Sequence, residues 1–310
     1  MDAIVGIDVS KDRLDAHIRP AGLAFSVTRD AEGLTSLVDH LTPLGVKAIG
    51  VEATGGFETM VVASLGAAGL PVVVVNPAQV RAFATALGKR AKTDPIDAAV
   101  IAHFVEAIKP EIRPLPDAQT QLFADLIARR RQILTMLVAE RQRETRAPER
   151  LRKSIKRLIK ALEKELDTLD RDIDRVVQSS PIWSKNEGLM SSVPGIGPNI
   201  ARTLMAELPE LGSLDRRKIA ALVGLAPWTR QSGQWRGKSF IGGGRAPARA
   251  ALFMGAMVAV QHNPVLKAFR ETLLAAGKPK MVTIIAVARK LLTILNAIIR
   301  DQKPWDPKSA

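Results

Sequence analysis

Short apolar strands alternate with helical stretches along the first hundred residues of the chain. The segment 13–19 alternates polar and apolar positions with a period of two, and 71–75 is wholly apolar. Continuous apolar strands separated by helices indicate a sheet that is covered on both faces. A three-strand meander followed by strand–helix–strand units is the order of a ribonuclease-H-like α/β fold. The expected elements are strands 3–9, 13–19 and 23–28, helix 32–41, strand 47–51, helix 57–67 and strand 71–75.

A different pattern begins after a proline-punctuated stretch at 110–116. Between residues 117 and 178 there is no glycine and one proline, Pro148, so two long helices that break near Pro148 are predicted. The second helix carries apolar residues in a heptad spacing, at Ile155, Ile159, Leu162, Leu166, Leu169, Ile173 and Val176. This helical coiled-coil arm is either an antiparallel hairpin within one chain or a dimerisation arm, and the pattern does not separate the two.

The last block, 181–310, is punctuated by glycine and is predicted to be mostly helical. Its long apolar helices are expected at 246–260 and 281–299. The sequence therefore predicts three parts: an α/β domain at 1–109, the arm at 110–180, and a mostly α C-terminal domain at 181–310. No apolar run approaches the ~20 residues that span a bilayer, and no basic leader precedes an apolar run. No membrane partner and a cytoplasmic location are expected.

Charge is distributed unevenly between these parts. Residues 1–109 hold 10 Lys and Arg against 12 Asp and Glu, whereas the remainder holds 35 against 19. The whole chain has a net charge of +14 and a pI of about 10.3. A slightly acidic N-terminal part joined to a strongly basic remainder favours a nucleic-acid partner over the alternative that the excess Lys and Arg only make the surface soluble.

Two amino acids are missing from the chain, and each absence excludes a type of chemistry. Without cysteine there are no disulfides, thiolate nucleophiles or cysteine-bound zinc. Without tyrosine, covalent attack by a side-chain oxygen is left to Ser, Thr or a carboxylate. The four histidines are too far apart in sequence for a His-rich helical metal site.

Four carboxylates are candidates for a metal site. Asp8 lies within an apolar strand, Glu52 follows the strand at 47–51, and Asp94 and Asp97 are spaced i, i+3 at the start of a helix. Singly, each has an ordinary explanation as a turn cap, an ion-pair partner or a first-turn helix acid. As a set, their oxygen ligands favour Mg²⁺ or Mn²⁺, which supports phosphoryl transfer. The same periodicity also permits an actin-like sugar kinase.

Two glycine-containing segments of the last block are candidates for nucleic-acid contacts. The run Val193-Pro194-Gly195-Ile196-Gly197 before a helix has the helix-hairpin-helix pattern, in which Gly195 and Gly197 expose N–H groups to a phosphate. A simple interhelical turn is the alternative. From residue 228 onward, tryptophans are interleaved with Arg and Lys side chains, a combination that suits stacking on bases and contact with phosphates. The residues concerned are Arg230, Trp235, Arg236, Lys238, Arg245 and Arg249.

Ser232 lies among these cations and precedes a glycine. Its hydroxyl could act as a nucleophile whose attacked phosphate is neutralised by Arg230, Arg236 or Arg245. From physical reasoning alone, a serine that shapes a hairpin turn remains the simpler explanation. Ser239 is the nearest alternative nucleophile.

The ordered set of motifs resembles the DEDD insertion-sequence transposases, which are bridge-RNA-guided recombinases. The likeness runs essentially end to end and includes residues 6–11, 51–55, 76–77, 92–98, 193–197, 220–227, 232–233 and 236–237. The resemblance implies a Holliday-junction-resolvase-like domain, a coiled-coil arm and a C-terminal transposase domain. The stretch 241–244 is variable in the family.

The same resemblance implies roles and partners. Asp8, Glu52, Asp94 and Asp97 match the metal-binding tetrad, and Ser232 matches a serine that attacks a DNA phosphodiester. A noncoding RNA from the element pairs with donor and target DNA, and the protein works as a dimer of dimers in association with the nucleoid. Two other functions stay open: a metal-dependent junction-resolving nuclease that uses water, and a non-catalytic nucleic-acid-binding scaffold.

Overall fold

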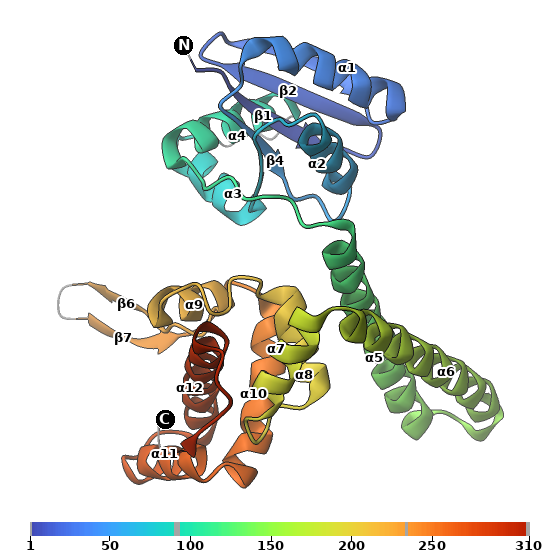
Figure 1. Cartoon of the computed structure of the whole chain (residues 1–310), viewed down its shortest axis with the longest axis vertical. Coiled ribbons are helices and arrows are strands. Elements are labelled where there is room, and N and C mark those ends of the chain that lie inside the picture. The colour runs from blue at the N-terminus through green and yellow to red at the C-terminus, as the bar shows by residue number, and fades with distance from the viewer. Residues whose placement is uncertain (1, 90–93, 233–234, 308–310) are drawn as a thin grey trace. The chain divides into compact units, whose positions relative to one another are not determined.

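The computed structural model describes residues 2–89, 94–232 and 235–307 (Figure 1). The side chains of Asp94, Pro95, Ile96, Arg230, Trp235, Arg236 and Lys238 lie outside this description. The chain divides into two compact units, Met1–Leu115 and Pro116–Ala310. The arm and the C-terminal block belong to one unit, and the three-part division at 109 and 180 stays a prediction.

The first unit is built on a five-stranded mixed sheet with the strand order β3-β2-β1-β4-β5. The first three strands form an antiparallel meander, whereas β4 and β5 run parallel to β1. This order confirms the predicted meander followed by strand–helix–strand units. The strands are β1 (Ile4–Val9), β2 (Arg13–Arg19), β3 (Leu23–Thr28), β4 (Ala48–Glu52) and β5 (Val72–Val75).

Helices cover both faces of this sheet, as the apolar strands require. Odd-numbered positions of β1 pack with α1 and α2 in one apolar cluster, and a second cluster joins β5 to α3 and α4 on the opposite face. The side chain of Asp30 caps α1, and that of Asn76 caps α3. Helix α3 was not predicted from the sequence pattern. The helices are α1 (Ala31–Leu41), the short η1 (Thr42–Leu44), α2 (Glu58–Ala67), α3 (Pro77–Ala86) and α4 (Asp94–Ile108).

The second unit begins with a helical hairpin of α5 (Ala118–Arg146) and α6 (Glu149–Ser179), which meet at Pro148 as predicted. The heptad residues Ile159 and Leu162 are buried against Ile133 and Leu137 of α5 in the same chain. Most of the apolar seam of α6 is therefore buried within one chain. This observation agrees with the intrachain hairpin.

The rest of the second unit is helical apart from one β-hairpin, β6 (Trp228–Ser232) and β7 (Trp235–Phe240). Its core is formed mainly by α10 and α12 with α8 and α9. Helix α12 is long and apolar enough to cross a membrane, but half of its most apolar window is buried in this core, as in core helices of soluble proteins. The helices are α7 (Pro181–Ser191), α8 (Pro198–Glu207), α9 (Arg216–Val223), α10 (Ala246–His262), α11 (Pro264–Ala275) and α12 (Lys280–Asp301).

Candidate nuclease and nucleic-acid-binding sites

Two of the candidate carboxylates lie at the same edge of the sheet in the first unit. Strands β1 and β4 are parallel, with Ile7 opposite Val51. Asp8 and Glu52 are the next residues of these strands, so they occupy adjacent positions at the carboxyl ends. Both side chains are half-buried, and each takes part in further interactions.

Helix α4 crosses the same face of the sheet at very close range. A Cβ atom on Gly6 would lie 2.2 Å from the backbone nitrogen of Ala102, and one on Gly50 would lie 2.4 Å from a methyl group of Val105. Because side chains alternate along a strand, Asp8 points to the face of Gly6 and Glu52 to the face of Gly50. The two glycines therefore seat α4 against the face that carries the acids.

The direction of α4 brings its first turn to the carboxylate edge. Arg19, which pairs with Ile4 at the start of β1, donates a hydrogen bond of 2.7 Å to Glu106 near the end of the helix. The opposite end of α4, with Asp97 next to the Gly6 contact at Ala98, consequently lies toward Asp8. Asp8 and Glu52 thus occupy neighbouring strand ends, and the first turn of α4, which carries Asp97, is directed toward the same edge.

The fourth member of the predicted tetrad, Asp94, begins α4, and its side chain lies outside the described residues. Among the side chains that are described, no three acids or histidines form a group that could hold a metal ion. The acids at and near this edge are all oxygen donors, which suit Mg²⁺ or Mn²⁺. The tetrad as a metal site stays a prediction.

The loop that follows Glu52 is closed by Glu58, a residue that the sequence analysis did not single out. The Glu58 carboxylate accepts hydrogen bonds from the backbone N–H groups of Thr54, at 3.0 Å, and Gly56, at 2.8 Å. Partial burial opposes ionisation, but these bonds and one from its own N–H together hold the pKa of Glu58 below its usual value. Gly55 and Gly56 both adopt positive φ in this loop, a conformation that favours glycine.

In the second unit, Ser232 ends β6 at the turn of the β-hairpin. It is exposed and pairs in register with Trp235, while residues 233 and 234 lie outside the described residues. The rival nucleophile Ser239 is engaged in a 2.8 Å hydrogen bond between its hydroxyl and that of Thr229 across the hairpin. At the foot of the hairpin, the rings of Trp228 and Phe240 lie 6.1 Å apart.

Two predicted nucleic-acid contacts are engaged inside the second unit. Arg245 forms a bidentate ion pair with Glu210, at 2.5 and 2.6 Å, and also donates to the carbonyl of Glu207 at 2.7 Å. Arg249 donates to the carbonyls of Val223, at 2.9 Å, and Gly243, at 2.5 Å. Both guanidinium groups therefore connect the glycine-rich stretch after β7 to the helical core.

The loop between α7 and α8 contains the predicted phosphate-binding glycines. Gly195 has a φ of +108°, and a Cβ there would lie 2.6 Å from the Cβ of Ala259 on α10. Close packing on α10 is thus a sufficient reason for a glycine at this position. Gly197 is the N-cap of α8 and has open space beside it.

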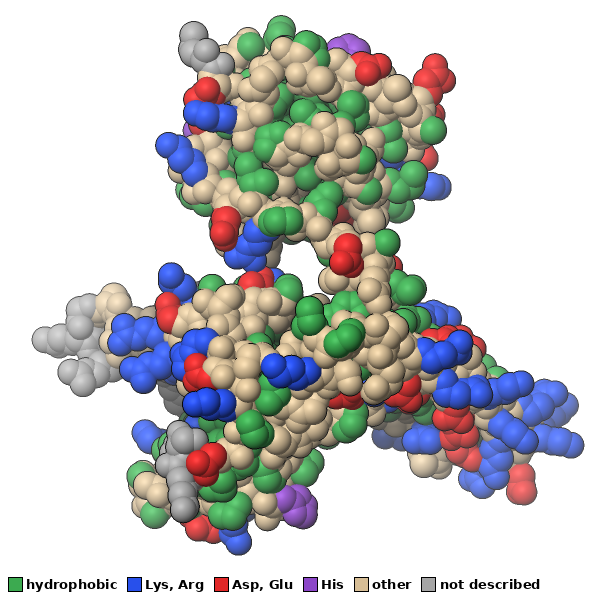
Figure 2. Space-filling model, in the orientation of Figure 1, with side chains coloured by type: hydrophobic (Ala, Val, Ile, Leu, Met, Phe, Trp, Pro, Cys, Tyr) green, Lys and Arg blue, Asp and Glu red, His purple; other side chains and the backbone are tan. Residues whose placement is uncertain are grey.

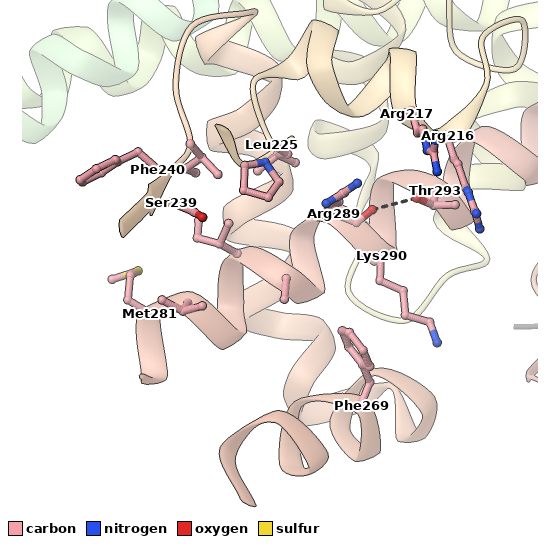
Figure 3. Close-up of a pocket in the computed structure, with 15 residues that line it drawn as sticks. Arg216, Arg217, Leu225, Ser239, Phe240, Phe269, Met281, Arg289, Lys290 and Thr293 are labelled. Carbon is pink, nitrogen blue, oxygen red and sulfur yellow. Dashed lines mark hydrogen bonds between the residues drawn. The ribbon is translucent and has the colours of Figure 1, made fainter. Parts of the chain in front are cut away.

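A groove lies beside the foot of the hairpin, between β7 and α12 (Figure 3). It has a volume of about 960 Å³ and combines an apolar floor with four cations. Residues of five separate segments line it, so no local sequence pattern indicates it. The cations are Arg216, Arg217, Arg289 and Lys290.

Basic side chains also gather at the end of the α5–α6 arm, as Figure 2 shows. Arg152, Lys153, Lys156, Arg157 and Lys160 are all exposed on α6. Their spacing places them on one face of the helix, away from the buried seam. In the described part of the chain, Lys156 is the only one of these with an acidic neighbour, Glu144 at 3.8 Å.

Comparison with known proteins decides the family. A family model for DEDD transposases of the IS110 type, described as a transposase, matches residues 5–163, and a second, "Transposase IS116/IS110/IS902 family", matches residues 187–271. The chain belongs to the IS110 family of transposases. Sequences with 29% identity over 98% of both chains include the "Pilin gene-inverting protein" of Moraxella lacunata and that of Moraxella bovis.

Among solved structures, a Holliday-junction protein aligns with part of this IS110-family transposase. The RuvC protein of T. thermophilus, solved in complex with a Holliday junction substrate, aligns with 36% of this chain and 99% of its own. The identity is 17% and the TM-score is 0.27. The ribonuclease-H-like character of the first unit rests instead on its own strand order.

Proposed function

We propose that this transposase cuts and rejoins DNA by attack of Ser232 on a phosphodiester, and that it thereby excises and inserts its own insertion sequence. The observation that carries the proposal is the exposed position of Ser232 at the end of β6. A hydroxyl at a hairpin turn can approach a DNA backbone without displacement of any core residue. Ser239, by contrast, already has a hydroxyl partner in Thr229.

In the proposed step the Oγ atom of Ser232 bonds to phosphorus, and the bond from phosphorus to one deoxyribose oxygen breaks. The serine loses its proton, and the departing oxygen gains one. The reverse attack, by a deoxyribose hydroxyl of another strand, releases the serine and joins the new strand. One phosphodiester is exchanged for another, so the reaction needs no ATP.

The acidic edge of the first unit is proposed to hold Mg²⁺ or Mn²⁺ through Asp8, Glu52, Asp97 and Asp94. When bound, such an ion would supply positive charge that stabilises the oxygens around the attacked phosphorus. The contribution of this chain is the placement of the acids: Gly6 and Gly50 let α4 approach, and β1 and β4 end side by side.

The choice of DNA sequence is assigned to a noncoding RNA of the element, which would pair with donor and target DNA. Support comes from the family and from the charge of the chain, +14 overall. The proposed oligomer is a dimer of dimers, which would contain several copies of the acidic edge and of Ser232. Gel filtration with light scattering in the presence of the RNA tests the assembly.

The proposal is tested by excision of the element in cells that express single variants. Ser232→Ala and Asp8→Asn are each expected to abolish excision, whereas Ser239→Ala retains it. A junction-resolving nuclease that uses water would tolerate Ser232→Ala but not Asp8→Asn. A non-catalytic scaffold would tolerate both changes, and either of these outcomes would overturn the proposal.

A further inference from the structure

The groove between β7 and α12 has no role in the reaction just described. Its floor is formed by side chains of α12 together with residues around the hairpin, as Figure 3 shows for Met281, Leu225 and Phe240. Several of these side chains are solvent-exposed, including Met281 and Val282. Pockets that hold ligands usually enclose about 300 to 1,000 Å³, and this groove, at about 960 Å³, is at the upper end.

Positive charge lines the groove and is not balanced there. No Asp or Glu is among its lining residues, and within the described residues the guanidinium groups of Arg216, Arg217 and Arg289 form no ion pair at 4 Å or less. Asp215, which caps α9, lies outside the groove lining and accepts hydrogen bonds from the backbone N–H groups of Arg217 and Lys218. The ammonium group of Lys290 lies 5.1 Å from the centre of the Phe269 ring, so its contact in the groove is with an aromatic face and not with a carboxylate. An occupant of this groove is therefore expected to be anionic as well as apolar.

The neutral polar side chains of the groove already have partners. The Ser239 hydroxyl is bonded to that of Thr229 at 2.8 Å, and the Thr293 hydroxyl donates to the carbonyl of Arg289 at 3.1 Å. One bond does not exhaust a hydroxyl, so these side chains do not distinguish a ribose strand from a deoxyribose strand. A DNA strand is favoured because the bond that Ser232 is proposed to attack is a DNA phosphodiester.

We infer that this groove binds a short single strand of DNA adjacent to the bond that Ser232 attacks. Bases would lie on the apolar floor and against Phe240, whose ring is paired with Trp228, while phosphates would meet Arg216, Arg217 and Arg289. Aromatic faces combined with cations are the usual surface for single strands. A duplex keeps its bases stacked inside, so it offers the floor no apolar face.

The location relative to Ser232 follows from the hairpin. Trp228 pairs with Phe240 at the groove, and Ser232 pairs with Trp235 at the other end of the same two strands. Four residues of strand at about 3.3 Å each separate these pairs by about 13 Å. A short oligonucleotide spans that distance. The inference rests on the proposed function for this location and for the choice of DNA, whereas binding itself requires no cleavage.

Binding is tested with full-length protein carrying Ser232→Ala, so that no cleavage intervenes. Fluorescence anisotropy with labelled eight-nucleotide oligodeoxythymidine measures Kd, and the matching RNA strand, a DNA duplex and an acidic peptide serve as competitors. The double variant R216E/R217E changes two exposed residues and is expected to weaken binding by about tenfold or more, because phosphate contacts dominate affinity. The control is K267E/K303E, two exposed lysines outside the groove.

Arg289→Met supplies a second variant inside the groove and should weaken binding at least threefold. Equal binding by the groove variants and the control would overturn the inference, as would RNA or the acidic peptide competing more strongly than the DNA strand. Because Ser232→Ala is the background, these results do not depend on the nucleophile. If Ser232→Ala abolished excision but the protein with Ser232 intact formed no serine adduct with DNA, that result would instead count against the proposed function.

Discussion

The Arg245 guanidinium donates two hydrogen bonds to the carboxylate of Glu210, at 2.5 Å from Nη1 and 2.6 Å from Nη2. Glu210 is 8% exposed. The backbone N–H of Arg245 donates to the carbonyl of Leu222 at 3.0 Å, so the pair also ties the stretch after β7 to the end of α9. The segment that follows β7, the second strand of the hairpin that carries Ser232, is therefore fixed to the helical core by an ion pair whose carboxylate is largely buried.

Replacement of Arg245 by methionine is expected to lower the free energy of unfolding by about 3 kcal/mol, because the largely buried Glu210 carboxylate would lose the guanidinium that donates two hydrogen bonds to it. Urea unfolding followed by circular dichroism measures the change. Arg300→Met, which breaks an exposed pair with Asp301, is the control and should leave the free energy of unfolding nearly unchanged, because solvent screens this pair. If Arg245→Met kept full stability but bound DNA more weakly, Arg245 would be a nucleic-acid contact, as the sequence suggested.

Gly6→Ala should displace α4 from the sheet, since the new Cβ would lie 2.2 Å from the backbone of the helix. Overpacking of this kind costs about 1–3 kcal/mol, and the shift would separate Asp97 from Asp8. Both stability and metal-dependent DNA cleavage are expected to fall. Gly188→Ala, in the open on α7, should leave cleavage unchanged and raise stability slightly. Normal cleavage by Gly6→Ala would contradict the proposed placement of the acids.

The Glu58 carboxylate should make stability depend on pH. Its pKa is lowered in the folded protein, so its stabilisation is present above the unfolded pKa and is lost as the pH falls through the folded pKa. Glu58→Gln is therefore expected to be less stable than the parent at pH 7, and the difference should shrink in acid. Unfolding free energies of the two proteins, measured from pH 7 downward, give this difference. A difference that stays constant with pH would contradict the argument.

The basic face of α6 is expected to bind phosphates without reading sequence. The variant K153Q/K156Q/R157Q/K160Q should bind a DNA duplex more weakly, and the slope of log K against log salt should become shallower by about 0.9 for each phosphate that is no longer neutralised. The control K267Q/K278Q/K280Q/K303Q removes the same charge from exposed lysines elsewhere in the unit. Identical salt slopes for the two variants would mean that the arm contributes only general charge.

The order of elements in the first unit could be predicted because each strand and most helices have a local sequence pattern. The wholly apolar run at 71–75 and the alternation at 13–19 both correspond to observed strands. The helix at Pro77–Ala86 was missed, since Val80 and Phe83 are its only large apolar residues and only its Asn76 cap signals it. Pro148 marked the break in the arm because proline cannot continue a helix at that point.

The environment of the candidate site residues was less predictable, because it depends on tertiary contacts. The cations Arg245 and Arg249 stand in a basic stretch, yet both are engaged by Glu210 and by backbone carbonyls from distant segments. Gly195 fits a phosphate-binding pattern and also packs on Ala259. The groove is assembled from α9, the loop before β6, β7, α11 and α12, so it exists only in the folded chain.

The central claim is that Ser232 is the nucleophile. A nicked suicide DNA substrate that releases a short fragment after cleavage traps any covalent intermediate, and peptide mass spectrometry then locates the attached nucleotide. Attack by Ser232 should leave a phosphodiester adduct on Ser232, which Ser239→Ala forms as well and which is absent from Ser232→Ala. Cleavage at the parent rate by Ser232→Ala, or an adduct on another residue, would contradict it.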